Sequence, residues 1–442
     1  MTMQKWHNSK LGTTEYPIVS MVACLGLIYF SPFVSLALNY LAFAVCLYRV
    51  VRYDESVFAI DYCVLAGVSY IFLSTGRVSL LAWLSIVAAL WYIVKNGVRR
   101  NTSFLLLILL LDYMLLRMQM ELNSFVLCAS QLILLYVLVS TQKKDGIIQS
   151  MVAFCISVIV SSIYAMIFRE TPKLRSLLGN ESAAYWGSSL PRFQGLFRDP
   201  NYYMTMIVIA ITLITILRMN QHISRKAYLA CMGCLLIFGA LTYSKTFVVV
   251  LVILVIICVA MLFYKGHFLI GIGVMLLSVP LSVALSDTLL SVTIYRITSA
   301  TNLHDLTTGR SDLLIDYFRE ITQSASSLFF GEGLSAEILE RGTHNLFLEV
   351  IYYFGLTGLF LMIAYFISLL NMFALKFKSN IQNPNGIFRY TAFVIFVILF
   401  CTLQGMTFVI TYVMLYLTIL ATAVTPKVDL LAASSEIEDG IA

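Results

Sequence analysis

Charged residues are scarce in this chain of 442 residues, and that scarcity excludes an ordinary soluble protein. Asp, Glu, Lys and Arg together make up 12% of the sequence, whereas hydrophobic residues make up 60% and the mean hydropathy is +0.89. Soluble domains carry about 25% charged residues, because their surfaces face water. The composition therefore predicts a membrane protein. The net charge of +6 follows from loop topology, as argued below, and we expect no nucleic-acid partner.

Residues and motifs typical of metal and nucleotide sites are also scarce. The chain has five histidines without a histidine-rich cluster, and it lacks a Walker loop and a GxGxxG pattern. The nine cysteines lie almost entirely in apolar stretches, including the CxxC pair Cys231 and Cys234. Small apolar packing residues explain these cysteines better than a redox or zinc site. We therefore expect no metal, no cofactor and no use of ATP.

Hydrophobic runs of about 16 to 25 residues, close to the length that crosses ~30 Å of hydrocarbon, occupy most of the chain. Backbone amides in lipid must be paired within their own segment, so these runs should be helices. The predicted fold class is all-α, a polytopic integral membrane protein with about 12–14 transmembrane helices. No small-residue cleavage site follows the first run, which predicts a retained helix rather than a signal peptide. The fourteen predicted spans are 17–33, 34–48, 57–74, 77–94, 103–117, 123–140, 147–168, 200–218, 226–243, 246–263, 267–285, 344–370, 388–404 and 406–424.

The turns within 17–48 and 388–424 are very short, and re-entrant segments there would reduce the number of spans to twelve. Two connections are long, and they divide the chain into five regions. These are N-terminal transmembrane helices (1–168), a first long extracytoplasmic loop (169–199), central transmembrane helices (200–285), a second long extracytoplasmic loop with an amphipathic helix (286–343), and C-terminal transmembrane helices with a cytoplasmic tail (344–442).

Lysine and arginine in the short loops predict the orientation, because cytoplasmic loops are enriched in both. The other side holds only Arg77, Arg117 and Lys245 in its short loops. Both termini should therefore lie in the cytoplasm and both long loops outside. The basic residues assigned to the cytoplasmic side are Lys5, Lys10, Arg49, Arg52, Lys95, Arg99, Arg100, Lys143, Lys144, Arg218, Arg225, Lys226, Lys265, Lys376, Lys378, Arg389 and Lys427.

The first candidate site segment is "LPRFQGLFRDPNYY", residues 190–203. Arg192 and Arg198 end the first long loop, and Asp199-Pro200-Asn201 suits a helix start because proline lacks the amide that would be unpaired there. Unpaired amides and the helix dipole favour anions, and guanidinium groups bind phosphate oxygens in a forked geometry. The segment predicts a phosphate site. The alternative is a loop whose arginines contact lipid headgroups.

Two further segments fall on the same predicted face. In "LTYSKTF", residues 241–247, Lys245 lies where two apolar helices meet almost without a loop. It is either a functional cation or a lysine that extends to interfacial water. In "TTGRSDLLIDYFREI", residues 307–321, Leu313, Leu314, Tyr317, Phe318 and Ile321 alternate with charged residues as in an amphipathic helix. Such a helix can lie on the bilayer as a lid, and the alternative is a solvated connector.

The last segment is "RGTHNLFLEVIYYFGLTG", residues 341–358, in which His344 opens a long apolar run. On a continuous helix Gly355 and Gly358 would lie on the same face as His344, with Gly355 about three turns deeper. Glycine permits close helix packing, which would fix the position of the histidine. A histidine at the water boundary can act as a base near neutral pH. The alternative is a residue at headgroup level that only caps its helix.

Together these segments resemble the superfamily of O-antigen ligases and O-antigen polymerases, the Wzy-like and WaaL-like membrane glycosyltransferases. His344-Asn345, nine residues, Gly355, two residues and Gly358 match the family's histidine pattern. "RFQGLFRDPN" is similar to the family's R-F-x-G-x-F-x-x-P-N segment, and "TYSK" to its T-x-S-R turn with lysine replacing arginine. "GRSDLL…LFFGEGL" is similar to the family's G-R…W…P-x-x-G-x-G loop, without the tryptophan and with Phe330 in place of proline.

The resemblance covers residues 190–360 and implies a metal-independent glycosyltransferase of the bacterial inner membrane with its site on the outer face. The donor would be a glycan on undecaprenyl diphosphate, and the acceptor a sugar hydroxyl on another lipid-linked repeat unit. His344 would be the catalytic base, and Asn201, Asn345, Gly355 and Gly358 would support the site. The residues expected to bind the diphosphate are Arg192, Arg198, Lys245, Arg310 and Arg341. Membrane lipids, a chain-length regulator and a flippase would be the partners.

Two other functions remain open from the sequence. A ligase would transfer the glycan to a lipid A core or to a protein, and we favour the polymerase because no large extra cationic surface is evident for a phosphorylated core. A polysaccharide-lipid transporter would explain Asp61, Asp112 and Glu349, since acids inside a membrane often mark transport paths. The sequence shows no repeated halves of the kind found in transporters.

Overall fold

The computed structural model describes residues 17–75, 78–118, 121–178, 192–264, 266–273, 310–334, 345–377 and 409–424, with positions 276, 298, 397 and 405. These residues fold into α-helices, and their one isolated β-bridge joins Leu73 to Ser79. The helices are α2 (Ile18–Phe30), α3 (Ala37–Arg52), α4 (Glu55–Ala66), α5 (Leu80–Asn96), α6 (Thr102–Leu116), α7 (Leu122–Thr141), α8 (Lys144–Phe168), α9 (Pro172–Leu178), α10 (Pro200–Met219), α11 (Arg225–Ala240), α12 (Lys245–Tyr264), α16 (Arg310–Thr322), α17 (Ala325–Phe330), α18 (Leu346–Phe377) and α20 (Val409–Thr422).

The all-α prediction is confirmed for the described residues. Four helices, α7, α8, α10 and α18, are long and apolar enough to cross a membrane. The first long loop contains the short helix α9, which the sequence analysis did not predict. Apart from positions 298 and 397, the predicted span 388–404 and residues 286–309 lie outside the described part of the chain, as does most of 267–285.

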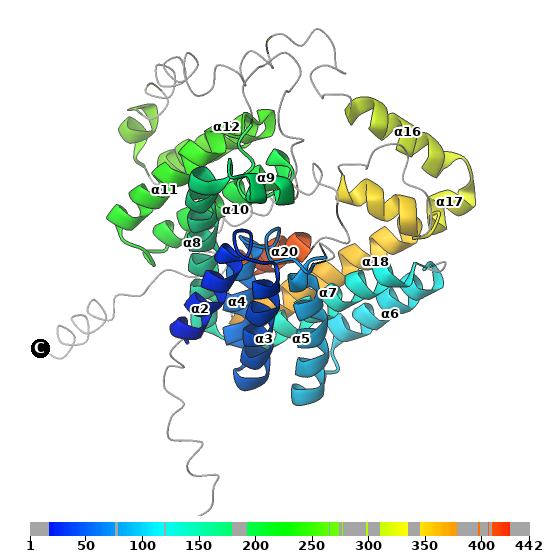
Figure 1. Ribbon diagram of the computed structural model, residues 1–442. Coiled ribbons are helices and arrows are strands. Elements are labelled where there is room, and N and C mark those ends of the chain that lie inside the picture. Colours follow the sequence, from blue (N-terminus) through cyan, green and yellow to red (C-terminus); the bar gives the residue numbers. More distant parts are fainter. Residues whose placement is uncertain are drawn as a thin grey trace, which may run out of the picture.

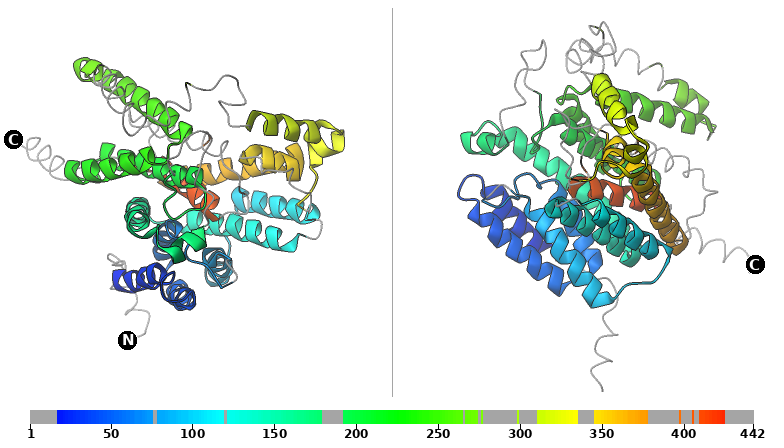
Figure 2. Two further views of the ribbon diagram at one scale, coloured as in Figure 1. Left: turned by 45° about the horizontal axis from the view of Figure 1, so that its top comes forward. Right: turned by 90° about the vertical axis from the view of Figure 1, so that its right-hand side faces the viewer.

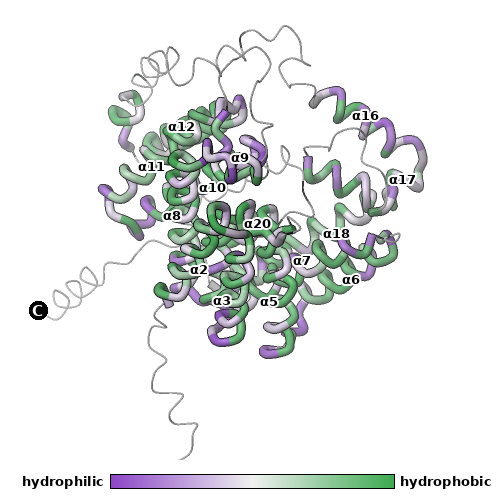
Figure 3. The backbone as a smooth tube through the Cα atoms, in the orientation of Figure 1, coloured by the Kyte–Doolittle hydropathy of each residue, from purple (hydrophilic) through white to green (hydrophobic). Residues whose placement is uncertain are grey.

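Helices α18 and α20 lie between two groups of helices at opposite sides of the molecule, α11 with α12 and α16 with α17 (Figures 1 and 2). Helix α10 is central: 83% of its apolar stretch is buried, against 22% for α18. In Figure 3 hydrophobic residues cover the outward sides of many helices, and polar residues gather near helix ends and in α16. The outermost apolar side chains are almost fully exposed, including Val19 at 84% and Leu269 at 85%. Such surfaces suit contact with lipid rather than water.

A buried ion pair joins α3 to α4. Arg49 Nε donates to Asp61 Oδ2 at 2.7 Å and its Nη2 donates to Oδ1 at 2.6 Å, and the two side chains are 0% and 4% exposed. Arg49 also donates to the carbonyl of Pro17 and to the Ser20 hydroxyl, which fixes the start of α2. The orientation prediction treated Arg49 as a cation of a cytoplasmic loop, but its side chain is buried. It neutralises Asp61 inside the helix bundle, where removing either partner would cost about 3–5 kcal/mol.

The helix predicted from residue 344 to residue 370 is not continuous. Gly355 has φ 65° and ψ −174°, which interrupts the helical backbone of α18. This conformation strongly favours glycine, because a Cβ atom would be strained at positive φ. The prediction that Gly355 lies on one helical face below His344 is therefore wrong. The interruption also explains the glycine better than helix packing does.

The segment that follows α17 packs into this interruption. Glu332 N donates to Tyr352 O at 2.7 Å, and Gly333 N donates to Tyr353 O at 2.9 Å. A Cβ atom on Gly355 would overlap backbone atoms of Phe329 and Phe330. The break in α18 thus releases two carbonyls that pair with the returning loop, and it provides the space that the loop needs.

Helix α6 holds the same loop from the other side. Tyr113 Oη donates to Phe354 O at 2.8 Å, Arg117 donates to Gly331 O, and Leu334 N donates to Arg117 O at 3.0 Å. Gly358 lies close by, since a Cβ atom there would contact the Tyr113 ring at 3.2 Å. Gly358 is thus a close-packing position with α6 as the neighbouring helix, and its support of His344 stays a prediction.

Replacing Gly355 by alanine should destabilise the protein strongly, because the new methyl group meets both a positive φ and fixed backbone. Backbone strain of this kind alone costs about 1–3 kcal/mol. The matched control is Gly233→Ala in α11, where a Cβ atom would meet nothing within 4 Å and alanine is a better helix former. Thermal unfolding of both purified variants tests this. Equal melting temperatures for the two variants would contradict the role given to Gly355.

Candidate functional site

Arg192 is the centre of the candidate site, and it is nearly buried at 4% exposure. Its Nε donates to Thr242 O at 2.7 Å, and its Nη2 donates to Asn201 Oδ1 at 3.2 Å. One guanidinium group therefore bridges the first turn of α10 and the turn between α11 and α12. These are two of the segments that the sequence analysis selected separately, and the fold brings them together.

Backbone contacts fix the segment between Arg192 and α10. Phe193 N donates to Leu241 O at 2.9 Å, and Phe197 N donates to Gln194 O at 3.0 Å. Gly195 has φ 55°, and a Cβ atom there would meet the Tyr203 ring at 2.5 Å. The chain therefore turns tightly against α10, which explains the glycine in "RFQGLF".

Helix α10 begins as predicted. The side chain of Asp199 is the N-cap and accepts from Asn201 N at 2.6 Å, and Pro200 occupies the first helical position. Arg198 beside this helix start is exposed. A buried arginine, an exposed arginine and the positive end of a long helix give this region a positive potential, which suits an anionic ligand.

Lys245 is the first residue of α12, directly after the turn that carries Thr242. The turn is tight: Tyr243 has φ 48°, and the Thr242 hydroxyl donates to Gly239 O at 2.6 Å. Lys245 is half-buried. Lys245 follows Thr242, whose backbone oxygen accepts from Arg192, by three residues, and the convergence of the two cations on one ligand stays a prediction.

The remaining predicted residues belong to the α16–α18 part of the molecule. Asn345 caps α18, since its Oδ1 accepts from Leu348 N at 3.1 Å and its backbone oxygen accepts from Glu349 N at 3.0 Å. Arg310 is the first residue of α16. His344 and Arg341 lie outside the described residues, as does the Arg310 side chain. The convergence of His344 with the cations beside α10 stays a prediction.

Two residues of the site were not predicted. Arg169, after α8, donates from Nη1 to Arg192 O at 3.2 Å and lies 5.9 Å from the centre of the Phe193 ring. Gln194 is 0% exposed, yet neither its Oε1 nor its Nε2 has a hydrogen-bond partner. A buried polar group without a partner costs about 1–3 kcal/mol. Each such group needs a partner, and a bound water or ligand would supply one.

Gln194→Leu should therefore leave the ligand-free protein as stable as the wild type, or make it more stable. The matched control is Gln131→Leu, because Gln131 is also buried but its Oε1 accepts from Tyr62 Oη at 2.7 Å. That variant leaves a hydroxyl unpaired and should unfold at a lower temperature. Thermal unfolding of both purified variants is the measurement. A large loss of stability in Gln194→Leu would show that the amide is structural.

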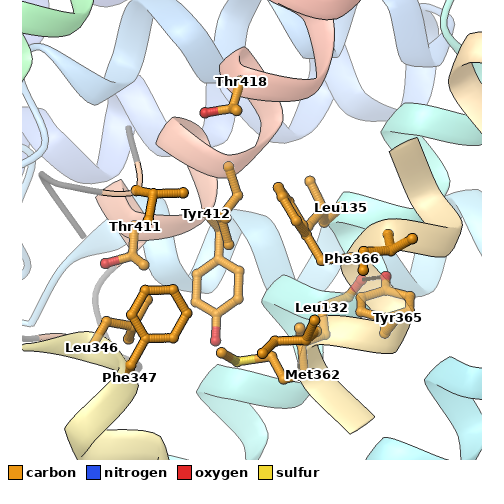
Figure 4. A pocket seen from close by; sticks show the side chains of 14 residues that line it. Leu132, Leu135, Leu346, Phe347, Met362, Tyr365, Phe366, Thr411, Tyr412 and Thr418 are labelled. Carbon is orange, nitrogen blue, oxygen red and sulfur yellow. Dashed lines mark hydrogen bonds between the residues drawn. The ribbon is translucent and has the colours of Figure 1, made fainter. Parts of the chain in front are cut away.

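An apolar cavity of about 230 Å³ lies between α7, α18 and α20 (Figure 4). Leu346 and Phe347, at the start of α18, form part of its wall. The hydroxyls of Thr411 and Thr418 donate to backbone oxygens, at 2.8 Å in both cases, so they add little polarity to the cavity. The cavity suits a hydrocarbon chain rather than a sugar or a phosphate.

The described residues contain no group of three or more His, Cys, Asp or Glu side chains placed to hold a metal ion. No protein-family model, no curated protein and no solved structure matches this chain. A function is therefore inferred from the contacts around Arg192 and from the sequence segments that they join.

Proposed function

We propose that this protein polymerises a bacterial surface polysaccharide. It transfers a glycan from undecaprenyl diphosphate to a sugar hydroxyl of another lipid-linked repeat unit. One observation carries the proposal: Arg192 bridges the start of α10 and the turn before α12. The two segments that resemble the polymerase and ligase superfamily thus contact each other, although about 40 residues separate them.

The cations fit the charge that develops in such a reaction. The acceptor hydroxyl attacks the anomeric carbon, the bond from that carbon to the diphosphate breaks, and the diphosphate leaves with the bonding electrons. Arg192, Arg198 and Lys245 stabilise the leaving diphosphate, and fixed cations of this kind lower the barrier because they do not reorganise during the reaction. His344 takes the proton of the attacking hydroxyl.

Helix α16 is proposed to form part of a lid at the membrane surface. Tyr317 is 1% exposed and its ring contacts Tyr352 of α18 at 5.0 Å between centroids. Ile315 and Phe318 remain exposed at 59% and 63%. The apolar residues of α16 thus face two ways, with one set packed on α18 and the other available to lipid. Arg310, the first residue of α16, and Arg341, which lies outside the described residues, are proposed to close over the diphosphate.

The ligase stays the alternative within the same chemistry, because the same cations would serve it. Two of the three acids that suggested a transporter have fixed partners. Asp61 is neutralised by Arg49, and Glu349 Oε2 accepts from Gly405 N at 2.9 Å. Of the three acids that suggested transport, only Asp112 is exposed. An acid that already has a fixed partner is poorly suited to exchange ions or protons along a path.

The surface glycan of a strain lacking the gene tests the proposal. A polymerase predicts single repeat units on the cell lipid and no longer chains. Full-length chains that stay on undecaprenyl diphosphate would identify a ligase instead. Repeat units retained on the cytoplasmic side would identify a transporter and would overturn the proposal.

We also propose that α17 and the cations beside α10 lie on the outer face of the inner membrane, because the basic loops collect on the other side. A cysteine replacing Ser326, which is exposed in α17, should react with an impermeant maleimide in intact cells. All cysteines among the described residues are buried or half-buried, which keeps the background low. A cysteine at Lys144, also exposed, is the control that should react only after lysis. The opposite pattern would invert the orientation.

A further inference from the structure

A groove of about 610 Å³ runs between the first turn of α6 and the second half of α18, at the opposite end of these helices from the Gly355 break. Its long wall is apolar: Phe360, Ile363 and Ile367 of α18 are 71%, 40% and 50% exposed. These side chains follow one another along the helix, so the groove is an extended strip rather than a round pocket. The lining residues are Asn101, Thr102, Ser103, Phe360, Ile363, Ala364, Ile367, Ser368, Asn371, Met372 and Leu375.

The end of the groove nearest Asn101 is polar. Asn101 is the N-cap of α6, and its Oδ1 accepts from Phe104 N at 2.9 Å while its Nδ2 donates to Met372 Sδ at 3.0 Å. The hydroxyls of Ser103 and Ser368 are hydrogen-bonded to each other at 2.8 Å. The groove therefore changes from hydrocarbon to amide and hydroxyl along its length, as a phospholipid does from its acyl chains to its glycerol.

Three cations flank residues of this polar end in the sequence, just outside the set of lining residues. Arg99 and Arg100, directly before Asn101, are exposed, and so is Lys376, one residue beyond Leu375. Helix α7 holds two of them in place: Tyr136 Oη donates to Arg99 O at 2.6 Å, and Lys376 Nζ donates to Ser140 O at 2.8 Å. Tyr136 and Ser140 lie one helical turn apart, so Arg99 and Lys376 contact the same part of α7.

We propose that this groove binds an anionic phospholipid. The phosphate and headgroup contact Arg99, Arg100 and Lys376, the glycerol contacts Asn101 and Asn371, and one acyl chain lies along Phe360, Ile363 and Ile367. Basic pockets between transmembrane helices are well suited to anionic headgroups on the cytoplasmic side. The apolar length of the groove excludes a free phosphate as the preferred ligand, because most of its surface would then stay uncovered.

The position of the groove gives the bound lipid a structural consequence. Helices α6 and α18 hold the loop after α17 at their other end through Tyr113, Arg117 and the Gly355 break. A lipid that fills the groove stabilises the packing of the same two helices. This inference does not depend on the proposed glycan chemistry.

The test is the thermal unfolding of the purified, delipidated full-length protein in detergent, with three probes. Phosphatidylglycerol should raise the melting temperature in a saturable manner, whereas phosphatidylcholine and glycerol phosphate should not. The triple variant R99Q/R100Q/K376Q should bind phosphatidylglycerol about 100-fold more weakly, since each cation near a headgroup contributes about a factor of five. The control is K144Q/R225Q/K226Q, which removes three exposed cations assigned to the same side of the membrane.

A second variant tests the groove apart from its charges. Ala364→Phe adds a ring to the groove wall and leaves all three cations in place. It should weaken the binding of phosphatidylglycerol while the melting temperature of the lipid-free protein stays near the wild-type value. Equal weakening by the control triple variant would mean that binding is only non-specific attraction. An equal response to phosphatidylcholine, or binding of glycerol phosphate with the same affinity, would also overturn the proposal.

Discussion

Replacing Arg192 by glutamine is expected to lower glycan transfer by at least about 100-fold, which is typical for the loss of one preorganised group that stabilises developing charge. Glutamine can still donate to one of the two acceptors, Thr242 O or Asn201 Oδ1. It cannot bridge both, and it carries no charge to place beside a leaving diphosphate. The length of the polysaccharide chains in cells is the measurement, at matched levels of each variant in the membrane.

A second variant at position 192 separates the charge of the arginine from its forked geometry. Arg192→Lys keeps the charge but loses the forked geometry, so transfer should fall less than in the glutamine variant while staying below the wild type. Arg175→Gln is the matched control, because Arg175 lies in the nearby helix α9 and its side chain is 54% exposed. Normal transfer by a folded Arg192→Gln protein would remove the central residue from the proposed site.

His344→Ala is expected to abolish chain extension while the protein remains folded and in the membrane. A positioned base typically contributes ~10²–10⁴-fold to the rate, which is enough to remove long chains in a cell. The Asn345 cap keeps α18 intact without the histidine, because the bonds to Leu348 N and Glu349 N come from the asparagine. The loss of activity should therefore occur without a loss of stability.

The control for this variant is His267→Ala, since His267 is exposed and lies beyond the end of α12. Chains of normal length should persist in that strain. Chains of normal length in the His344→Ala strain would mean that the histidine is only a residue at the helix end. The diphosphate would then leave without this base, and the proposed mechanism would have to assign proton transfer elsewhere.

The helices were predictable because their signal is redundant. Each apolar run contains many residues that favour burial in lipid. One misjudged residue therefore does not change the predicted position of the helix. The start of α10 was also predictable, because Asp199 and Pro200 act through local geometry alone. The break in α18 was not, because it depends on carbonyls of residues 352 and 353 that pair with a loop about 20 residues earlier. From the sequence alone, a glycine in an apolar run does not indicate which segment of the chain packs against it.

The residue types of the candidate site were selected from the sequence, whereas most of the contacts around Arg192 could not be. Arginine and lysine at the expected outer helix ends indicated an anion site, and the fold places Arg192 against the turn that leads to Lys245. Arg169 and Gln194 were missed, because their roles depend on burial and on neighbours distant in the sequence. Arg49 was misplaced for the same reason: next to Arg52 it resembles a loop cation, and only its contact with Asp61 shows that it is buried.

The most direct test of the central claim is transfer by the purified protein in liposomes. The substrate is a single repeat unit on undecaprenyl diphosphate, which serves as both donor and acceptor, with no nucleotide sugar added. The account predicts glycans of two or more repeat units on the lipid, and one undecaprenyl diphosphate released for each bond formed. The Arg192→Gln protein should release none above background. Two results would contradict the account. One is that the repeat units stay single with folded wild-type protein, and the other is that chain growth requires a nucleotide sugar.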